Sequence, residues 1–172
     1  MRLDKLTTKF QEALSDAQTL ALGADHAFIE PCHLLVAMLK QDDGPRSLLM
    51  RAGVNINGLL KDCEEAIKNL PQVHGQEQVQ VSRDLVTLLQ AAEKDALKRG
   101  DQSVAGELFI LAFSESKSEL ANKARAHGLN KQSLHAAIEA VRGGESVKSA
   151  DAEGHMQSKL GYDHSKNDQC GE

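Results

Sequence analysis

An internal repeat constrains this chain more than any other feature, because residues 10–67 match residues 85–141 at one landmark after another. Phe10 aligns with Leu85 and His33 aligns with Glu107, and the offset is one smaller at the second pair, so one residue is lost between them. Other matched segments are 13–14 with 88–89, 33–37 with 107–111, 52–55 with 127–130 and 65–67 with 139–141. The period is longer than the roughly 20–50 residues of solenoid repeats. We therefore expect a duplicated helical unit whose two copies pack as one pseudo-symmetric domain.

The composition favours helices packed closely around an aliphatic core. Of the 172 residues, 41% are hydrophobic but only 3% are aromatic, and tryptophan is absent. The core must therefore consist of Leu, Ala, Ile and Val, a mixture that suits helix packing better than a β-sandwich. The length fits one ordinary domain that can bury its own core.

Apolar residues at helical spacing, bounded by capping and breaking residues, predict eight helices. The expected helices run from Thr8 to Gly23, Pro31 to Leu39, Pro45 to Gly53, Asn55 to Pro71, Ser82 to Gly100, Val104 to Phe113, Leu120 to His127 and Asn130 to Arg142. Thr8 and Gln11 have the spacing of a capping box at the start of the first helix. The expected fold class is all-α, with two four-helix repeats, at about residues 1–71 and 82–142, packed as one pseudo-twofold domain.

The character of the chain changes after Gly143 and Gly144. Residues 149–172 are rich in Gly, Ser, Asp, Glu, Lys and His and contain only scattered apolar residues. Such a segment cannot bury enough apolar surface to offset the entropy of ordering it. We expect one domain at residues 1–148, followed by a flexible linker or a divergent tail at 149–172.

The charge and the cysteine content indicate which binding partners and which cellular location to expect. The formal net charge is −5, with acidic and basic residues interleaved, which disfavours a nucleic-acid partner. No apolar run is long enough to cross a bilayer, and the first six residues contain no apolar signal core. Three cysteines without CxxC spacing are typical of reduced thiols in a cytoplasmic protein. No GxxxxGK[ST] phosphate loop occurs, so we expect no ATPase activity from this chain and no cofactor.

Histidines and cysteines come near one another at two places, and neither spacing fits a metal site. Cys32 and His33 are adjacent on an expected helix, so their side chains point about 100° apart and cannot readily share an ion. We expect His33 to be a half-buried structural histidine. His155, His164 and Cys170 match no structural zinc pattern. No metal site is expected.

Asp101 and Glu107 are two carboxylates at the ends of neighbouring expected helices. Asp101 follows the helix break at Gly100, and Glu107 lies in the first turn of the next expected helix, where the helix dipole favours a carboxylate. Helix capping and a binding role are both open interpretations of these two residues. Catalysis is disfavoured, because a catalytic pair needs a cleft, contrasting environments and usually a third group.

Several segments taken together resemble the Clp amino-terminal (Clp repeat) domain family, and most of all the N domain of ClpB-type disaggregase chaperones. The resemblance covers residues 1 to about 148. It rests on MRLDKLT at 1–7, FIEP followed by HL at 28–34, LPQV at 70–73, KRGD at 98–101, GELF at 106–109 and RGGESV at 142–147. The last segment resembles the start of the family's mobile linker to its first ATPase domain.

The resemblance implies a noncatalytic domain that binds unfolded or aggregated polypeptide and passes it to a hexameric ATPase ring. The substrate-binding residues that it implies are Thr7, Asp101, Glu107, Leu89 and Leu108. The two leucines match an apolar groove that adjoins the other three residues in the family. Two further groove positions fall on Ala91 and Asp95, where the family would have larger apolar side chains.

Two other functions stay open at this point. The domain could dock a folded adaptor as part of a Clp protease regulator, or it could act as a stand-alone Clp-repeat regulator. Relatives that feed a protease can recognise phosphorylated arginine with one carboxylate from each repeat, but here the first-repeat position is Cys32 and only Glu107 matches, so such a site is disfavoured. We expect the isolated domain to be a monomer without nucleic-acid or membrane partners.

Overall fold

The chain folds into α-helices joined by short loops, and the structure, a computed structural model, describes residues 2–151. In order, the elements within this range are a 3-10 helix η1 at Leu3–Lys5, α1 at Thr8–Gly23, β1 at Phe28–Ile29, α2 at Pro31–Leu39, α3 at Arg46–Arg51, α4 at Ile56–Lys68, β2 at Gln80–Val81, α5 at Arg83–Arg99, α6 at Gly106–Ser114, α7 at Glu119–Ala126 and α8 at Lys131–Arg142. The predicted all-α class is confirmed, with most helix ends within two residues of their predicted places. Residues 152–172, the larger part of the predicted linker or tail, lie outside the described range.

The N-cap of the first helix lies one residue earlier in the chain than predicted. Thr7, and not Thr8, is the N-cap, since its hydroxyl accepts a hydrogen bond of 3.2 Å from the amide of Phe10. The predicted capping box at Thr8 and Gln11 is therefore wrong, because the Gln11 side-chain amide donates instead to the carbonyl of Leu6 at 2.8 Å. A hydroxyl that satisfies one of the first free amides is the usual way to stabilise a helix start.

Three of the four helix starts in the second half follow those of the first half at a constant interval, and the remaining pair, α3 and α7, has an interval two residues shorter. Thr7, Glu30 and Asn55, the N-caps of α1, α2 and α4, correspond at one fixed offset to Ser82, Ala105 and Asn130, the N-caps of α5, α6 and α8. This offset is the one that separates Phe10 from Leu85, so the predicted loss of one residue before the second helix of the repeat is wrong. Glu107 corresponds to Cys32, the second residue of α2, and His33 corresponds to Leu108.

Two short parallel strand pairings join the halves, and they are related to each other by the same repeat interval. In the parallel pair of β1 and β2, Ile29 lies opposite Val81. A second parallel bridge joins Leu6 to Val104. Leu6 precedes Val81, and Ile29 precedes Val104, by the same repeat interval. Ile29 therefore pairs with the repeat counterpart of Leu6, and Leu6 pairs with the repeat counterpart of Ile29. A pseudo-twofold axis produces contacts of this kind, and the pairings are consistent with two four-helix repeats.

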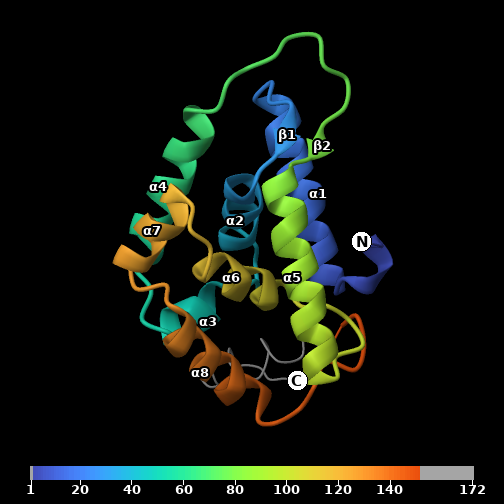
Figure 1. Ribbon diagram of the computed structural model, residues 1–172, viewed down its shortest axis with the longest axis vertical. Helices are drawn as coiled ribbons and strands as arrows, with labels where there is room; N and C mark the ends of the chain where they lie inside the picture. Colours follow the sequence, from blue (N-terminus) through green and yellow to red (C-terminus); the bar gives the residue numbers. More distant parts are fainter. Residues whose placement is uncertain (1, 152–172) are drawn as a thin grey trace.

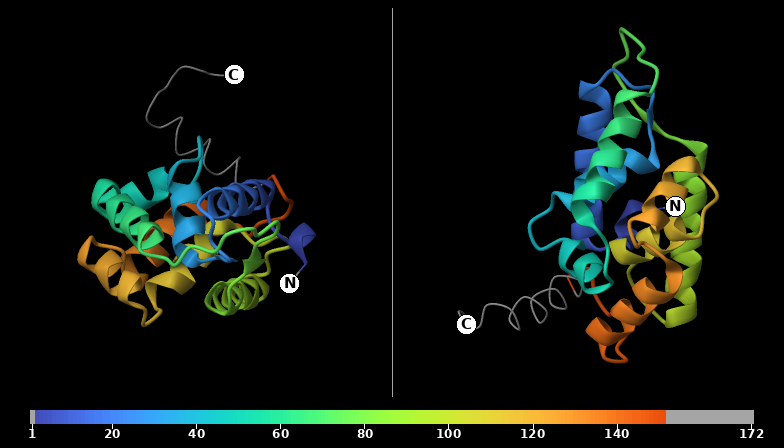
Figure 2. Two further views of the ribbon diagram at one scale, coloured as in Figure 1. Left: turned by 90° about the horizontal axis from the view of Figure 1, so that it is seen from above. Right: turned by 90° about the vertical axis from the view of Figure 1, so that its left-hand side faces the viewer.

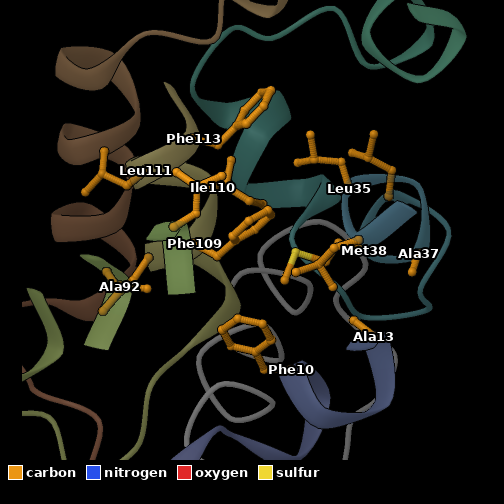
Figure 3. Close-up of a cluster of buried hydrophobic side chains, with 14 of the residues drawn as sticks. Phe10, Ala13, Leu35, Ala37, Met38, Ala92, Phe109, Ile110, Leu111 and Phe113 are labelled. Atoms are coloured by element: carbon orange, nitrogen blue, oxygen red, sulfur yellow. The ribbon is translucent and has the colours of Figure 1, made fainter. Parts of the chain in front are cut away.

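The core runs without interruption through both halves. Helices α2 and α6 lie at its centre (Figure 1), and every residue of α2 after Pro31 is buried. The ring centroids of Phe10 from α1 and Phe109 from α6 are 6.4 Å apart, and those of Phe109 and Phe113 are 6.5 Å apart (Figure 3). Figure 2 shows α1–α4 on one side of the molecule and α5–α8 on the other. Because the two sides share one apolar core, they form a single domain.

Candidate functional site

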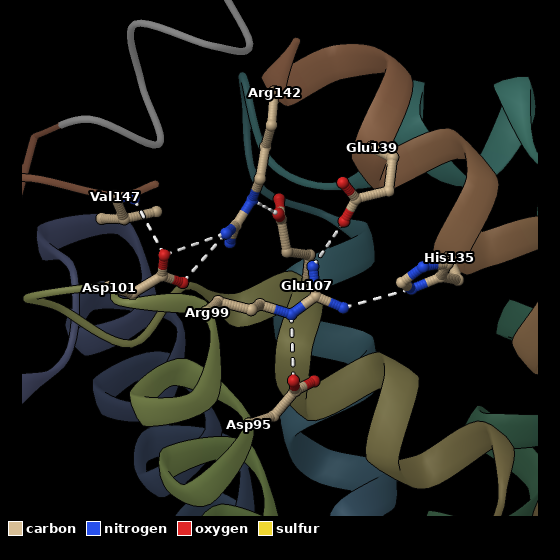
Figure 4. Close-up of polar contacts among 8 residues, drawn as sticks. All are labelled: Asp95, Arg99, Asp101, Glu107, His135, Glu139, Arg142 and Val147. Atoms are coloured by element: carbon tan, nitrogen blue, oxygen red, sulfur yellow. Dashed lines mark hydrogen bonds and ion pairs between the residues drawn. The ribbon is translucent and has the colours of Figure 1, made fainter. Parts of the chain in front are cut away.

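Three charged side chains meet in the interior of the second half, where α5, α6 and α8 come together (Figure 4). The Arg142 guanidinium donates from Nε to Glu107 Oε2 at 2.8 Å and from Nη1 to both oxygens of Asp101, at 3.1 and 2.9 Å. The side chains of Asp101, Glu107 and Arg142 are only 0%, 6% and 3% exposed. Charges this far from water need close partners, since desolvation is costly, and each of the three has them.

The sequence places each member of this ion cluster at the end of a helix. Gly100 ends α5 in the left-handed conformation, with φ of 78°, and Asp101 follows it with its amide bonded to the Ala96 carbonyl at 2.9 Å. Glu107 lies in the first turn of α6 and Arg142 is the last residue of α8. Glu107 and Arg142 each carry the sign of charge that their helix dipole favours. The cluster thus gathers charges from three helix ends that would otherwise be solvated.

Two carboxylates share one guanidinium, so the cluster contains an excess of one negative charge when both are ionised. Burial raises the pKa of Glu107, and the neighbouring Arg142 guanidinium opposes that shift. Arg142 Nη2 is buried and has no hydrogen-bond partner among the residues that the structure describes. A pair of carboxylates held in this way by an arginine is fixed in position and has no open cleft for a reacting group.

The segment after α8 returns to this cluster, and residues 147–151 are called the strap below. The amide of Val147 donates to Asp101 Oδ1 at 2.9 Å, and the Val147 carbonyl accepts from the amide of Gln102 at 2.7 Å. Val147 is fully buried. Further along, the amide of Thr8 donates to the Ala150 carbonyl at 3.0 Å. The strap therefore crosses the domain from the end of α5 to the start of α1.

The strap is held by few contacts for its length. One buried valine contributes roughly 1.5–3 kcal/mol. The hydrogen bond to the Asp101 carboxylate contributes about 1.5–3 kcal/mol, and those with Gln102 and Thr8 contribute about 1 kcal/mol each. Fixing the backbone of residues 147–151 costs about 1–2 kcal/mol for each residue. The gain matches only the lower part of this cost, so the docked strap is at most marginally stable.

The predicted site residues lie below the surface. Thr7 and Leu108 are fully buried, and Leu89 is 6% exposed. The Thr7 amide donates to the carbonyl of Val104 at 3.0 Å, which places it beside the loop that joins α5 to α6. Thr7, Asp101 and Glu107 lie around the loop that joins α5 to α6, and Leu108 follows Glu107 in α6, whereas Leu89 lies in the middle of α5, well away from Asp101 at the end of that helix. Asp101 is the member that reaches a main-chain amide outside the helices.

Ala91 and Asp95, the two departures from the expected groove, lie on α5. Ala91 is exposed. Asp95 accepts from Arg99 Nε at 2.9 Å, and Arg99 also donates to Glu139 at 2.7 Å (Figure 4). A short polar network of Asp95, Arg99 and Glu139 thus occupies the side of α5 that faces α8.

The first half has a neutral histidine pair where the second half has charge. His33 is fully buried, more so than the half-buried state that the sequence predicts, and its Nδ1 accepts from the amide of Glu30 at 2.9 Å. Nε2 of His33 therefore carries the proton and donates to Nδ1 of His26 at 3.0 Å. Burial, followed by the neighbouring His26, lowers the pKa of His33 to about 4. This pair fixes the loop between α1 and α2.

No group of three metal-ligating side chains occurs within residues 2–151. Cys32 and Cys63 are buried free thiols, and burial raises the pKa of each to about 12. His155, His164 and Cys170 lie outside the described residues. Within the described range there is also no helix with both the length and the apolar character needed to cross a membrane.

Among the surface hollows lined by described residues, two have partly apolar linings. One, of about 300 Å³, lies between α5, the end of α6 and the start of α2, and its lining includes Leu88 and Phe113. The other, of about 360 Å³, lies between α1 and the β1–β2 pair, and its lining includes Leu3, Leu14 and Val81. Both have apolar floors with polar rims, the kind of surface that can accept an apolar side chain of a partner.

Sequence reasoning missed two residues of the site, Arg142 and Val147. Arg142 continues the buried stripe of Leu134 and Ile138 at four-residue spacing, which is a signal that it faces the core. Val147 is an apolar residue isolated among Gly, Glu, Ser and Lys, and no local pattern indicates that it is buried. Its neighbours in space come from residues more than forty positions earlier.

Comparison with known proteins settles the family. The family model described as the Clp repeat (R) N-terminal domain matches residues 5–127. The chain belongs to the Clp repeat N-terminal domain family. The chaperone protein ClpB of Pseudomonas putida is 42% identical to it over 160 residues, which are 92% of this chain and 19% of that protein. The chain thus spans about a fifth of the length of the curated relatives that it matches.

Solved structures of other Clp repeat domains share the fold. The N-terminal domain of Hsp104 from Candida albicans superposes with a TM-score of 0.76 at 18% identity, covering 87% of this chain and 99% of that one. A complex of the ClpV N-domain with a VipB peptide matches with a TM-score of 0.65 at 20% identity, covering 86% of this chain and 92% of the other. At these identities the likeness extends to the fold alone, and the predicted resemblance to Clp N domains is confirmed.

Proposed function

We propose that this Clp repeat domain is a noncatalytic recognition domain that binds unfolded or aggregated polypeptide for a ClpB-like disaggregating chaperone. In a longer protein it would pass the client to a hexameric ATPase ring. The observation that carries the proposal is the contact between Asp101 and a stretch of non-helical main chain. The carboxylate accepts a hydrogen bond from the amide of Val147, while the adjacent Gln102 amide donates to the Val147 carbonyl. The cytoplasmic location expected from the cysteine content is part of the proposal.

The state of the charged groups supports recognition over catalysis. Asp101 and Glu107 are both bonded to Arg142, and their side chains are at most 6% exposed. A general acid or base must reach a substrate proton, whereas a carboxylate fixed by an arginine presents a lone pair in a constant direction. Such a lone pair suits a main-chain amide, which every polypeptide offers.

The five predicted site residues take different parts in this proposal. Asp101 contacts the client main chain. Glu107 fixes Arg142, which in turn orients Asp101. Thr7 holds the start of α1 beside the same corner, Leu108 packs in the core next to Glu107, and Leu89 packs in the core under the middle of α5. Four of the five therefore act by shaping the surface, and direct contact is assigned to Asp101.

A binding measurement with a client that cannot refold tests the proposal. A fluorescently labelled polypeptide, reduced and alkylated at its cysteines, is titrated with the full chain, and its native disulfide-bonded form is titrated in parallel. Burying ~300–400 Å² of apolar client surface at ~25 cal/mol/Å² yields roughly 8–10 kcal/mol. Association and ordering costs reduce this, so we expect micromolar or weaker binding of the unfolded form only. Equal affinity for both forms would favour the adaptor-docking function, and no binding of the unfolded form would contradict the proposal.

Conservative substitutions are needed to test the carboxylates. Replacing both Asp101 and Glu107 by alanine would leave Arg142 buried without a partner and would unfold much of the corner. Glu107→Gln keeps the shape and an acceptor for Arg142. It should lower client affinity severalfold, because Arg142 orients Asp101 less firmly, while a change at an exposed residue of the first half, Lys40→Ala, should leave affinity unchanged. Equal losses from the two variants would place the client surface elsewhere.

A further inference from the structure

The strap presents to the second-half corner the same groups that an unfolded client would present. Val147 contributes one amide to Asp101, one carbonyl to Gln102 and one apolar side chain to a fully buried position. Figure 4 shows Val147 beside Asp101, on the side away from Glu107 and Arg99. These three contacts use no feature that is particular to the strap, apart from the size of one aliphatic side chain.

We propose that the strap occupies the edge formed by Asp101 and Gln102 as an internal substitute for client, so that an extended segment of unfolded polypeptide must displace it in order to bind. The inference rests on the proposed function, since it requires the domain to bind polypeptide. It specifies the ligand as an extended segment with a β-branched or similar aliphatic residue at the place of Val147. Folded proteins are excluded, because their main-chain amides and carbonyls are already paired.

The manner in which the strap is attached makes it displaceable. Beyond Val147, its ties to residues within 2–151 include the bond from the Thr8 amide to the Ala150 carbonyl and a bond of 3.3 Å from the Thr8 hydroxyl to Asp151. Both lie at the surface, where water can replace them. The opened edge keeps its geometry, since Asp101 is held by Arg142 and its own amide is bonded to the Ala96 carbonyl.

The equivalent corner of the first half is closed to a client. There the chain that leaves α4 passes the loop after α1 and bonds through the Val73 amide to the Asp25 carbonyl at 2.7 Å. It then continues into β2, which pairs with β1. Because this connection is part of the sheet and is anchored at both ends by helices, displacing it would break the domain. Of the two corners within residues 2–151, that of the second half is the one whose covering segment can leave.

Releasing the strap should therefore raise client affinity. Val147→Asp places a carboxylate beside Asp101, and like charges at such a distance exclude the docked state. If the strap blocks the edge for about 70–90% of the time, its release raises the apparent affinity about three- to tenfold, because the competent fraction rises to one. Met50→Asp adds the same charge at a residue of α3 that is 61% exposed, and it should leave affinity unchanged. An affinity in Val147→Asp equal to or below that of the wild type, with the helices intact by circular dichroism, would overturn the inference.

Amide exchange in the unaltered chain provides a test that needs no substitution. The Val147 amide is protected by its bond to Asp101, so saturating amounts of the alkylated, unfolded polypeptide should speed its hydrogen exchange severalfold, while exchange of helix α6 stays constant. Client that binds without changing Val147 exchange would contradict competition with the strap but leave polypeptide binding intact. Absence of client binding in both the wild type and Val147→Asp would instead refute the proposed function itself.

Discussion

The loop after α1 and the loop after α5 have the same backbone and opposite chemistry. In the first half the amide of His26 bonds to the Ala21 carbonyl at 2.9 Å, and in the second half the amide of Asp101 bonds to the Ala96 carbonyl at the same distance. The two bonds are separated by the repeat interval. The preceding residue has positive φ in both loops, but it is Asp25 in the first half, with φ of 61°. The shared backbone conformation therefore accommodates either the imidazole of His26 or the carboxylate of Asp101 at this position.

The neighbouring positions differ in the same way. Cys32 and Ile67 in the first half correspond to Glu107 and Arg142 in the second, counted from the starts of their helices. One corner is therefore closed by apolar packing and a histidine pair, while the other is closed by an ion cluster that also reaches the strap. Under the proposed function, the binding chemistry would lie in a few side chains of one half, and the fold alone would not determine it.

The largest effect is expected when the ion cluster loses its cation. Arg142→Met leaves two carboxylates buried without that partner, which should lower the free energy of unfolding by about 3–5 kcal/mol. The matched first-half change, Ile67→Met, conserves volume in an apolar site and should cost under about 1.5 kcal/mol. Both are measured by urea denaturation monitored by circular dichroism. Adding Glu107→Leu to Arg142→Met should recover part of the loss, and equal costs for the two single variants would contradict the contrast between the halves.

An intermediate loss of stability is expected at acidic pH, through protonation of His33 in the first half. The pKa of His33 is about 4 in the folded protein and 6.5 in the unfolded chain, so the unfolded chain binds the proton first as pH falls. This contribution to stability is complete above pH 6.5 and is lost as pH falls to 4, by about 3 kcal/mol. His33→Gln should remove that part of the acid sensitivity, whereas His74→Gln, at an exposed residue, should not. The free energy of unfolding is compared at pH 7 and pH 4, and unchanged acid sensitivity in His33→Gln would show that the pair does not fix the first corner.

The smallest effect is expected where the two halves are alike. Asn55 caps α4 through the Gly58 amide at 3.2 Å, and Asn130 caps α8 through the Ser133 amide at 2.9 Å. Replacing either asparagine by alanine should cost about 1 kcal/mol, with the two costs within about 0.5 kcal/mol of each other. Thermal or urea unfolding of the two single variants checks this. Clearly different losses in the free energy of unfolding would show that the two caps contribute unequally despite their similar geometry.

The helices could be predicted from the sequence because their signals are local. Pro31, Asn55, Ser82 and Gly100 each act within one turn of the place where they occur, and the structure uses all four as helix ends. The register between the halves was harder to predict, since the matching glutamates at 65 and 139 favoured an interval one residue too short. The caps of three helix pairs, α1 with α5, α2 with α6 and α4 with α8, keep one constant interval, because backbone geometry sets it and side-chain identity does not.

The ion cluster could not be predicted because its contacts are distant in sequence. Arg142 lies 41 residues from Asp101 and 35 from Glu107. A basic residue at a helix end is usually solvated and favoured by the dipole, so its position at the end of α8 argues against burial. Asp101 and Glu107 were identified as functional candidates through the family resemblance, whereas the contact of Asp101 with Val147 required coordinates.

A client titration followed by backbone NMR compares the two corners within one molecule and tests the central claim directly. Amide signals of Gln102 and Val147 report on the second corner, and those of Ala27 and Val73 report on the first. On adding unfolded polypeptide to the full chain, we expect the Gln102 and Val147 signals to shift with a single micromolar or weaker affinity while the Ala27 and Val73 signals stay in place. Shifts confined to the first corner, or equal shifts at both, would contradict the account.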